Sequence, residues 1–237
     1  MLYVIGTPIG NLSDITLRAL EALKSADVIA AEDTRHSGNL LRHYAIRKPL
    51  VSYHQHNEAM RTAQLAERLA AGETVALITD AGMPGLSDPG ARLIARCIAD
   101  GLAYTILPGA SAILTALVGS GFALDRFAYH GFLPVKSGGR ERDLRLAAAS
   151  EQTTVFFESP HRLNKTLAVC AEVMPQRTIC VARELTKKFE EFRRGTAAEL
   201  LAHYEAHPPK GEITLVIAGE KQPTARPFRD PSSPAAR

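Results

Sequence analysis

Short apolar runs alternate with amphipathic stretches through the first half of the chain. Each apolar run is four residues long, and together they predict five buried strands: Leu2–Ile5, Val28–Ala31, Leu50–Tyr53, Val75–Ile78 and Tyr104–Leu107. Apolar residues at helical spacing between these runs predict helices: one that begins near Ser13, then Asn57–Ala71, Ala91–Ala99 and Ala110–Val118. Strands that alternate with helices in this way predict a largely parallel sheet covered on both faces.

The second half contains more strands with fewer long helices between them. The predicted strands are Phe127–His130, Thr154–Phe157, Ile179–Arg183, Glu191–Gly195 and Ile213–Ala218. The predicted helices are a basic segment at Lys136–Ala149, followed by Leu163–Val173 and Ala197–Tyr204. Because some strands follow one another without a crossover helix, a mixed sheet is expected here.

The chain is long enough for two domains. Its 237 residues include the segment GSGFALD at 119–125, whose glycines predict a linker. We therefore expect an α/β fold of two α/β domains, residues 1–118 and 126–220, joined by 119–125. Proline, arginine and serine dominate after Gln222, which predicts a disordered tail at 221–237.

Residues 101–124 carry no charge, and about 20 such residues could span a bilayer. Pro108-Gly109 and Gly119-Ser120-Gly121 divide this stretch into pieces of strand and helix length, so no membrane span is expected. The three cysteines lack any Cys-x-x-Cys spacing, which fits a protein of the reducing cytoplasm. These features predict a cytoplasmic protein.

Net charge does not identify a partner. The chain carries a formal charge of +3, but residues 221–237 hold four basic residues and one acidic residue. Residues 1–220 therefore contain 24 of each sign. Bulk charge in the predicted folded part does not indicate a nucleic-acid-binding protein.

Four loops rich in glycine, proline and polar residues follow predicted strands. They are Gly6–Asn11, Ala31–His36, Thr79–Gly90 and Pro108–Ala112. Ligands bind at the carboxyl ends of strands in open α/β sheets, so the four loops together favour a ligand cleft, although each alone could be a simple turn. No dinucleotide or triphosphate fingerprint is present. Loops of backbone amides and small side chains suit an uncharged or zwitterionic ligand that contains adenosine.

Nine motifs occur in order along nearly the whole predicted folded chain. They are GTPIGNLSDIT, AEDTR, SYHQHNE, DAGMPGLSDPG, PGASA, GFLP, FFESPHRL, ARELTKKFEE and KGEI. Together they resemble the ribosomal RNA 2′-O-cytidine methyltransferases of the tetrapyrrole methylase family. The resemblance implies S-adenosylmethionine (S-adenosyl-L-methionine, SAM) as methyl donor in a cleft between two α/β domains. It also implies a homodimer that acts on a decoding-region cytidine of 16S ribosomal RNA in the small ribosomal subunit.

The resemblance also implies which residues contact SAM. The family's contacts fall on the first loop, the loop at 79–90, the PGASA turn and two motifs of the second domain. By position these residues are Ile9, Ala81, Gly82, Met83, Leu86, Ser111, Ala112, Glu158 and Leu185. Orientation of the donor methyl toward the attacking oxygen is the main physical demand on such a site.

A ribose 2′-hydroxyl is weakly acidic, so a base or a cation near it would help catalysis. AEDTR and ARELTKK supply the candidates for this role: Glu32, Asp33, Arg35 and Lys188. The alternative for AEDTR is an ion-pair network that only positions its loop. Both interpretations are kept, since charged clusters at strand ends serve both purposes.

Basic residues of the second half are candidates for RNA phosphate contacts. They are Lys136, Arg140, Arg142, Arg162 and Lys187. Gly138-Gly139 predicts that the segment around Lys136 is a mobile flap, although a solvated helix start is the alternative. No metal site is expected, because His54 and His56 lack further ligands.

Two other functions fit the same residues. A SAM-dependent methylase of a small molecule such as a tetrapyrrole is one of them. The other is a module that binds SAM or RNA without catalysis. The basic segment and ARELTKK favour a phosphate backbone over a carboxylated macrocycle, and paired charged motifs favour an enzyme.

Overall fold

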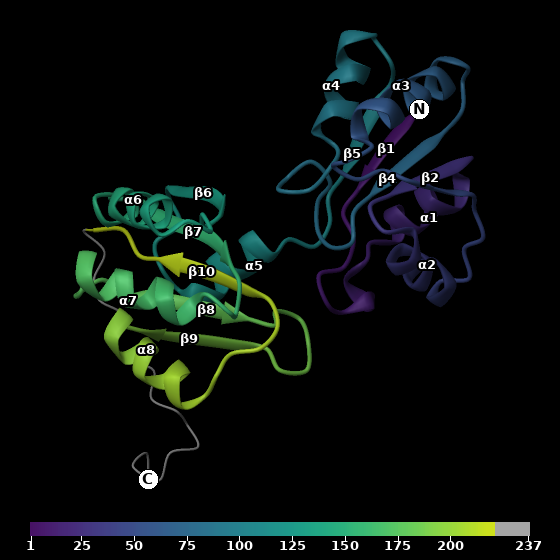
Figure 1. Ribbon diagram of the computed structural model, residues 1–237. Coiled ribbons are helices and arrows are strands. Elements are labelled where there is room, and N and C mark those ends of the chain that lie inside the picture. Colours follow the sequence, from purple (N-terminus) through teal and green to yellow (C-terminus); the bar gives the residue numbers. More distant parts are fainter. Residues whose placement is uncertain (221–237) are drawn as a thin grey trace. The chain divides into compact units, whose positions relative to one another are not determined.

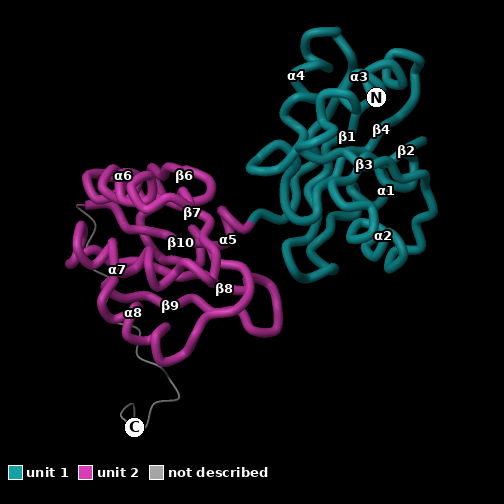
Figure 2. Tube along the Cα trace, viewed as in Figure 1, with its two compact units in different colours: residues 1–111 teal, residues 112–237 magenta. Residues whose placement is uncertain are grey.

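The structure is a computed structural model that describes residues 1–220, and the predicted disordered tail 221–237 lies outside them (Figure 1). The chain forms two compact units (Figure 2). Unit 1 is Met1–Ser111, and unit 2 begins at Ala112. Each unit is built on a five-stranded sheet, and the two-domain α/β fold expected from the sequence is confirmed.

The sheet of unit 1 is entirely parallel, in the order β3-β2-β4-β1-β5. Its strands are β1 (Leu2–Ile5), β2 (Val28–Ala31), β3 (Leu50–Ser52), β4 (Val75–Ile78) and β5 (Tyr104–Leu107). Its helices are a 3-10 turn, η1 (Leu12–Asp14), and α1 (Leu17–Ser25), α2 (Thr34–His43), α3 (Glu58–Ala70) and α4 (Ala91–Ala99). One apolar core contains side chains of α1 and α2, and a second contains side chains of α3 and α4. Both faces are covered, as the continuous apolar strands predict.

Two helices of unit 1 differ from the sequence-based expectation. The helix expected from near Ser13 begins only at Leu17, because Thr16 caps it by accepting a hydrogen bond from the Ala19 N–H at 3.1 Å. Helix α2 was not predicted at all. Apart from Ser37, it buries only Leu40 and Leu41, so its sequence lacks a helical repeat of apolar residues.

The sheet of unit 2 has the order β6-β7-β10-β8-β9. Its strands are β6 (Phe127–Phe132), β7 (Thr153–Glu158), β8 (Ile179–Arg183), β9 (Glu191–Gly195) and β10 (Ile213–Ile217). Its helices are α5 (Ala112–Ser120), α6 (Ser137–Ala148), α7 (Leu163–Val173) and α8 (Ala197–Ala206). Only β6 and β7 pair in parallel, and the other neighbours are antiparallel, so the expected mixed sheet is confirmed.

The division between the units falls before Ala112 and not within the expected linker 119–125. Helix α5 buries Ile113, Ala116 and Leu117 and contacts strands β8, β9 and β10 of unit 2. The Arg194 guanidinium also donates to the backbone carbonyls of Gly119 and Ser120. The apolar residues of a helix are buried when the helix packs against the face of a sheet. Because α5 packs against the sheet of unit 2, it belongs to unit 2 and not to unit 1.

The basic segment that was expected to be a mobile flap is helical. Gly138 and Gly139 lie in the first turn of α6, which extends to Ala148. Among residues 1–220, no helix combines the length and apolar character that a membrane span requires.

Candidate functional site

The loops after β1 and β5 of unit 1 touch backbone to backbone. A Cβ atom at Gly109 would lie 2.8 Å from both the Cα and the carbonyl oxygen of Gly6. A Cβ atom at Gly6 would lie 2.7 Å from the Met83 sulfur and 2.9 Å from the Gly109 Cα. Only glycine fits at either position, so these residues keep three loops in close approach at the carboxyl ends of the strands.

The loop after β4 is joined to the loop after β1 by a short bridge. The Thr7 N–H donates to the Gly82 carbonyl at 2.9 Å, and the Gly82 N–H donates to the Thr7 carbonyl at 3.1 Å. A Cβ atom at Gly82 would lie 3.7 Å from Ile9 Cγ2 and 3.9 Å from the Ala110 carbonyl oxygen. The structure therefore brings together the predicted SAM contacts Ile9 and Gly82.

The remaining predicted SAM contacts of unit 1 lie on the same loops. Ala81 and Met83 are half-buried next to Gly82, and Leu86 is exposed. Ser111 and Ala112 are half-buried and directly follow Ala110, at the point where the two units meet along the chain. Backbone groups and small side chains dominate this surface, as the sequence predicts for a ligand without phosphate charge.

A residue of helix α3 holds the end of the loop at 79–90 in position. Gly90 has a φ of 145°, and a Cβ atom there would lie 2.8 Å from the Gly85 nitrogen. The Glu58 carboxylate accepts hydrogen bonds from the Gly90 N–H at 3.1 Å and from the Tyr53 hydroxyl at 3.2 Å. The loop is therefore held in its conformation before any ligand arrives.

Three carboxylates gather at the ends of the neighbouring strands β2 and β4. The Glu32 carboxylate accepts a hydrogen bond from the Asp80 backbone N–H, and the Asp80 carboxylate accepts one from the Asp33 backbone N–H at 3.1 Å. Burial raises the pKa of Glu32, and the Asp80 carboxylate raises it further. Burial, followed by repulsion from Glu32 and Asp80, raises the pKa of Asp88 to about 6.

These three side chains are here named the acidic cluster: Glu32, Asp80 and Asp88. None of them forms an ion pair with a lysine or arginine of residues 1–220. Because the pKa values of Glu32 and Asp88 are raised and no lysine or arginine pairs with them, these two carboxylates can accept a proton near neutral pH.

Asp33 and Arg35, which were candidates for catalysis, form a local helix cap. The Asp33 carboxylate accepts hydrogen bonds from the Arg35 backbone N–H at 2.8 Å and from its guanidinium at 3.0 Å. These hydrogen bonds lower the pKa of Asp33 to about 2. Such a carboxylate is a poor proton acceptor, and the Arg35 side chain is 91% exposed. The ion-pair interpretation therefore fits Asp33 and Arg35, whereas Glu32 joins the acidic cluster.

Sequence reasoning missed Asp80 and Asp88 as candidates. Both lie in TDAGMPGLSDPG, which was interpreted only as a glycine-rich cradle for the donor. The sequence did contain a signal for these residues. AEDT and TDAG each follow an apolar strand of the predicted parallel sheet, and their carboxylates lie close together if the two strands are neighbours.

Glu158 and Arg162 of unit 2 form a buried ion pair with each other. The Arg162 guanidinium lies 2.7 Å from the Glu158 carboxylate, whose side chain has no exposed surface. The same carboxylate accepts hydrogen bonds from the Thr166 hydroxyl at 2.5 Å and from the Ser159 N–H at 2.7 Å. Arg162 also donates to the Leu133 carbonyl at 3.1 Å. The structure therefore gives both side chains a role in holding the start of α7, and the SAM contact expected of Glu158 and the phosphate contact expected of Arg162 stay predictions.

The ARELTKK motif forms a turn between β8 and β9. Leu185 is buried, and the Lys187 ammonium lies 2.8 Å from Glu184 and 2.9 Å from Glu212. Lys188 is exposed, with its ammonium 5.7 Å from the centre of the Phe189 ring. Of the two lysines, Lys188 is the one available to a substrate, and Lys187 is held by two carboxylates.

The basic residues of α6 are not equivalent. Lys136 and Arg142 are exposed, but Arg140 is only 6% exposed and donates to the Val135 carbonyl at 3.4 Å. A guanidinium buried on the inner face of the helix cannot track a phosphate backbone, so the expectation for Arg140 is corrected. The phosphate contacts of Lys136 and Arg142 stay a prediction, and the Arg142 guanidinium lies 2.9 Å from the Asp143 carboxylate.

Within residues 1–220, no group of three or more His, Cys, Asp or Glu side chains has the arrangement of a metal site. The rings of His54 and His56 lie 5.8 Å apart between their centres. The Nε2 atom of His54 is 3.2 Å from the Asn57 amide nitrogen.

The sequence is similar to a family of known enzymes. Residues 1–201 match the family described as tetrapyrrole (corrin/porphyrin) methylases. Ribosomal RNA small subunit methyltransferase I of Synechocystis is 48% identical over 220 residues, which cover 92% of this chain and 79% of that protein. The protein of the same name from Thermotoga maritima is 44% identical, with 93% of this chain and 99% of that protein covered.

Solved structures with lower sequence identity share the fold. The methyltransferase CobJ superposes with a TM-score of 0.69 at 21% identity, covering 96% of this chain and 97% of that chain. Uroporphyrin-III-C-methyltransferase of Thermus thermophilus gives a TM-score of 0.64 at 22% identity, covering 91% of this chain and 93% of that chain.

Proposed function

The chain belongs to the tetrapyrrole methylase family, and from this premise we propose that it methylates the ribose 2′-oxygen of a cytidine in 16S ribosomal RNA. The donor is SAM, and the cytidine lies in the decoding region of the small ribosomal subunit. Similarity to proteins named ribosomal RNA small subunit methyltransferase I supports the RNA substrate. The acidic cluster is the observation on the molecule that supports 2′-hydroxyl chemistry.

The loops of unit 1 fit the donor. Gly6 and Gly109 leave no room for side chains between the loops, and Gly82 keeps backbone atoms close to Ile9. Ala81, Gly82 and Met83 would hold the amino-acid portion through backbone groups, with Ile9 and Leu86 as apolar walls. When bound, SAM supplies a methyl group on a positively charged sulfur. A rigid loop orients such a ligand without ordering cost at the moment of reaction.

Asp88 is the base that the structure supports best. Its pKa of about 6 leaves it mostly ionised at neutral pH, yet basic enough to accept a proton from a hydroxyl that is being methylated. Burial keeps that pKa high, and repulsion from Glu32 and Asp80 adds to the effect. Glu32 remains the second candidate, since burial raises its pKa as well.

RNA contacts are assigned to exposed cations of unit 2. Lys136 at the N-cap of α6 and Arg142 within this helix would meet phosphates, and Lys188 lies in the ARELTKK turn. We expect Lys188→Ala to lower RNA methylation more than SAM affinity. Equal loss of both would place Lys188 at the donor site. The homodimer and the cytoplasmic location implied by the family resemblance are part of the same proposal.

Methylation of ribosomal particles tests this function. Small subunits from a strain that lacks the gene are incubated with the protein and methyl-labelled SAM, and the modified nucleotide is mapped by mass spectrometry. One labelled cytidine ribose is expected. Label on a small tetrapyrrole instead would establish the small-molecule methylase, and binding of SAM or RNA without any transfer would establish a non-catalytic module.

A further inference from the structure

Unit 2 contains a pocket on strands β8 and β9 that the proposed methyl transfer does not use. Its volume is about 500 Å³, and it is lined by the ends of these strands, by α8 and by residues 207–210. This volume lies within the usual range for small-molecule sites. We call it the β8–α8 pocket.

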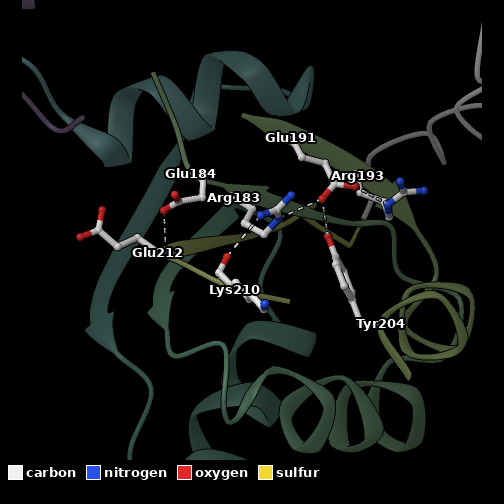
Figure 3. Close-up of polar contacts among 7 residues, drawn as sticks. All are labelled: Arg183, Glu184, Glu191, Arg193, Tyr204, Lys210 and Glu212. Carbon is white, nitrogen blue, oxygen red and sulfur yellow. Dashed lines mark hydrogen bonds and ion pairs between the residues drawn. The ribbon is translucent and has the colours of Figure 1, made fainter. Parts of the chain in front are cut away.

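The charges beneath the β8–α8 pocket are neutralised within the protein (Figure 3). The Glu191 carboxylate lies 3.1 Å from the Arg183 guanidinium and 2.7 Å from the Arg193 guanidinium. It also accepts a hydrogen bond from the Tyr204 hydroxyl at 3.5 Å. Although burial opposes them, the two guanidinium groups lower the pKa of Glu191. The pocket therefore does not carry an uncompensated negative charge that would repel an anion.

Phenyl and imidazole rings line the β8–α8 pocket. The rings of His203, in the last turn of α8, and His207, which caps this helix, are stacked, with ring centres 4.8 Å apart and planes 22° from parallel. Burial, followed by the positive charge of Arg193, lowers the pKa of His203, so this ring is neutral at physiological pH. The Phe189 side chain at the edge of the pocket is 65% exposed. Exposed flat rings of this kind are the usual partners of unstacked nucleobases.

Two lysines lie at this pocket. The Lys188 ammonium lies over one face of the Phe189 ring, 5.7 Å from its centre, and leaves the opposite face for a base. Lys210 is exposed and also lines the pocket, and its carbonyl accepts a hydrogen bond from the Arg183 guanidinium at 3.3 Å. Ammonium groups at a stacking surface match the phosphate that follows each base in a nucleic acid.

The segment that carries Lys210 is fixed in position. The Glu184 carboxylate accepts hydrogen bonds from the Lys187 ammonium at 2.8 Å and from the Glu212 N–H at 3.0 Å. Gly211 has a φ of 83°, a backbone conformation that favours glycine, and the Glu184 carboxyl occupies the space that a Cβ atom would need. Lys210 is therefore held at the edge of a pocket that already exists without a ligand.

We propose that the β8–α8 pocket binds one unstacked nucleotide of the RNA substrate. Its base stacks on Phe189 and the histidine rings, and its phosphate contacts Lys188 and Lys210. This inference rests on the proposed RNA substrate and adds a second RNA contact to it. Stacking tolerates any base, so the pocket would hold the strand without reading its sequence.

Binding and crosslinking of the full chain test the pocket. A fluorescent single-stranded RNA of about ten nucleotides is titrated with wild type, Phe189→Ala and Lys210→Ala. Each variant should bind roughly tenfold more weakly than wild type, with unchanged SAM affinity. Leu146→Ala and Lys165→Ala, two exposed positions on α6 and α7, are the matched controls and should bind like wild type. Photocrosslinking with 4-thiouridine RNA should label Phe189 or residues 203–210.

The results separate this inference from the function on which it rests. If wild type methylates small subunits but both pocket variants bind RNA normally, the pocket inference is wrong and the function stands. If RNA binding falls in the variants while no methyl transfer is found, the pocket is supported and the function is wrong. Crosslinks confined to other segments, or from the pocket to a ribosomal protein on intact subunits, would also overturn the inference. Absence of RNA binding by wild type would overturn both.

Discussion

Two pairs of carboxylates, one pair in each unit, have opposite surroundings. In unit 1, Glu32 and Asp88 have raised pKa values and no lysine or arginine partner among the described residues. In unit 2, Glu184 and Glu191 have lowered pKa values, because Lys187 bonds the first and the Arg193 and Arg183 guanidiniums outweigh burial at the second. Carboxylates that form ion pairs with lysine or arginine stabilise the fold, whereas carboxylates without such partners can exchange protons near neutral pH.

The topology of the two sheets accounts for this difference. Parallel strands bring their carboxyl ends to one edge, so loops after β2 and β4 place like charges together at the candidate active site. Antiparallel strands place side chains in cross-strand pairs, and Arg183 faces Glu191 in the β8–β9 register. Opposite charges therefore cancel in unit 2.

The largest expected effect is on methyl transfer in Asp88→Asn. Loss of the general base should reduce the single-turnover rate at neutral pH by about 100- to 1,000-fold, with SAM affinity nearly unchanged. Filter-binding assays of labelled small subunits measure the rate, and calorimetry measures the affinity. Glu67→Gln, an exposed carboxylate on α3, is the control and should keep the full rate. A wild-type rate in Asp88→Asn would remove Asp88 from the mechanism.

Gly109→Ala should weaken SAM binding by about tenfold or more, because the added methyl group overlaps the Gly6 backbone and forces two loops apart. Calorimetric titration with SAM measures this effect. Gly38→Ala is the control, since nothing lies within 4 Å of a Cβ atom at that helical position. If both variants bind SAM equally well, the contact between the loops does not shape the donor site.

Glu191→Gln should destabilise unit 2 by about 2 kcal/mol, because Arg183 and Arg193 lose the charge that compensates them. Hydrogen exchange of amides in β8 and β9 reports this loss separately from unit 1. Glu205→Gln on the exposed side of α8 should leave exchange unchanged. Unchanged protection in Glu191→Gln would mean that the ion pairs of unit 2 contribute no stability.

The smallest expected effect is a pH-dependent gain in stability from Asp88→Asn. The folded pKa of Asp88 is about 6, above its ordinary value of 3.8, so the folded state binds this proton more tightly than the unfolded state. The free energy of unfolding of wild type therefore falls as the pH rises from about 4 to about 6, because Asp88 must ionise in the folded state. The uncharged asparagine of the variant does not ionise, so the variant avoids this loss. Thermal melts should show the variant about 2–4 °C above wild type at pH 7 and close to it at pH 4. A variant that melts below wild type at pH 7 would contradict the raised pKa.

The fold was largely predictable because most elements carry a clear apolar period. Strands β1, β2, β4 and β5 have the predicted bounds, since short apolar runs in a parallel sheet are continuous in sequence. Helix α2 was missed because its start depends on the Asp33 cap rather than on a repeat of apolar residues. The place of α5 depends on contacts with strands that lie far away in sequence, which no local pattern reveals.

The candidate site was only partly predictable. The four loops follow from the alternation of strands and loops in the sequence, whereas the expected SAM contact of Gly82 comes from the family resemblance. The sequence does not predict that Glu32 and Asp33 have different surroundings. The Glu32 side chain interacts with Asp80, whereas the Asp33 side chain interacts with Arg35. Arg140 and Arg162 look like phosphate contacts in the sequence, and only the structure reveals that Arg140 is buried and that Arg162 is paired with the buried Glu158 carboxylate.

The dependence of the methyl-transfer rate on pH tests the central claim most directly. Single-turnover rates on small subunits at saturating SAM are measured from pH 5 to 8 for wild type and Asp88→Asn. The wild-type rate should rise with pH and level off above an apparent pKa near 6, and the variant should lack this rise. A rise near pH 6 that is the same in both proteins, or a flat wild-type profile, would contradict a proton-accepting role for the acidic cluster.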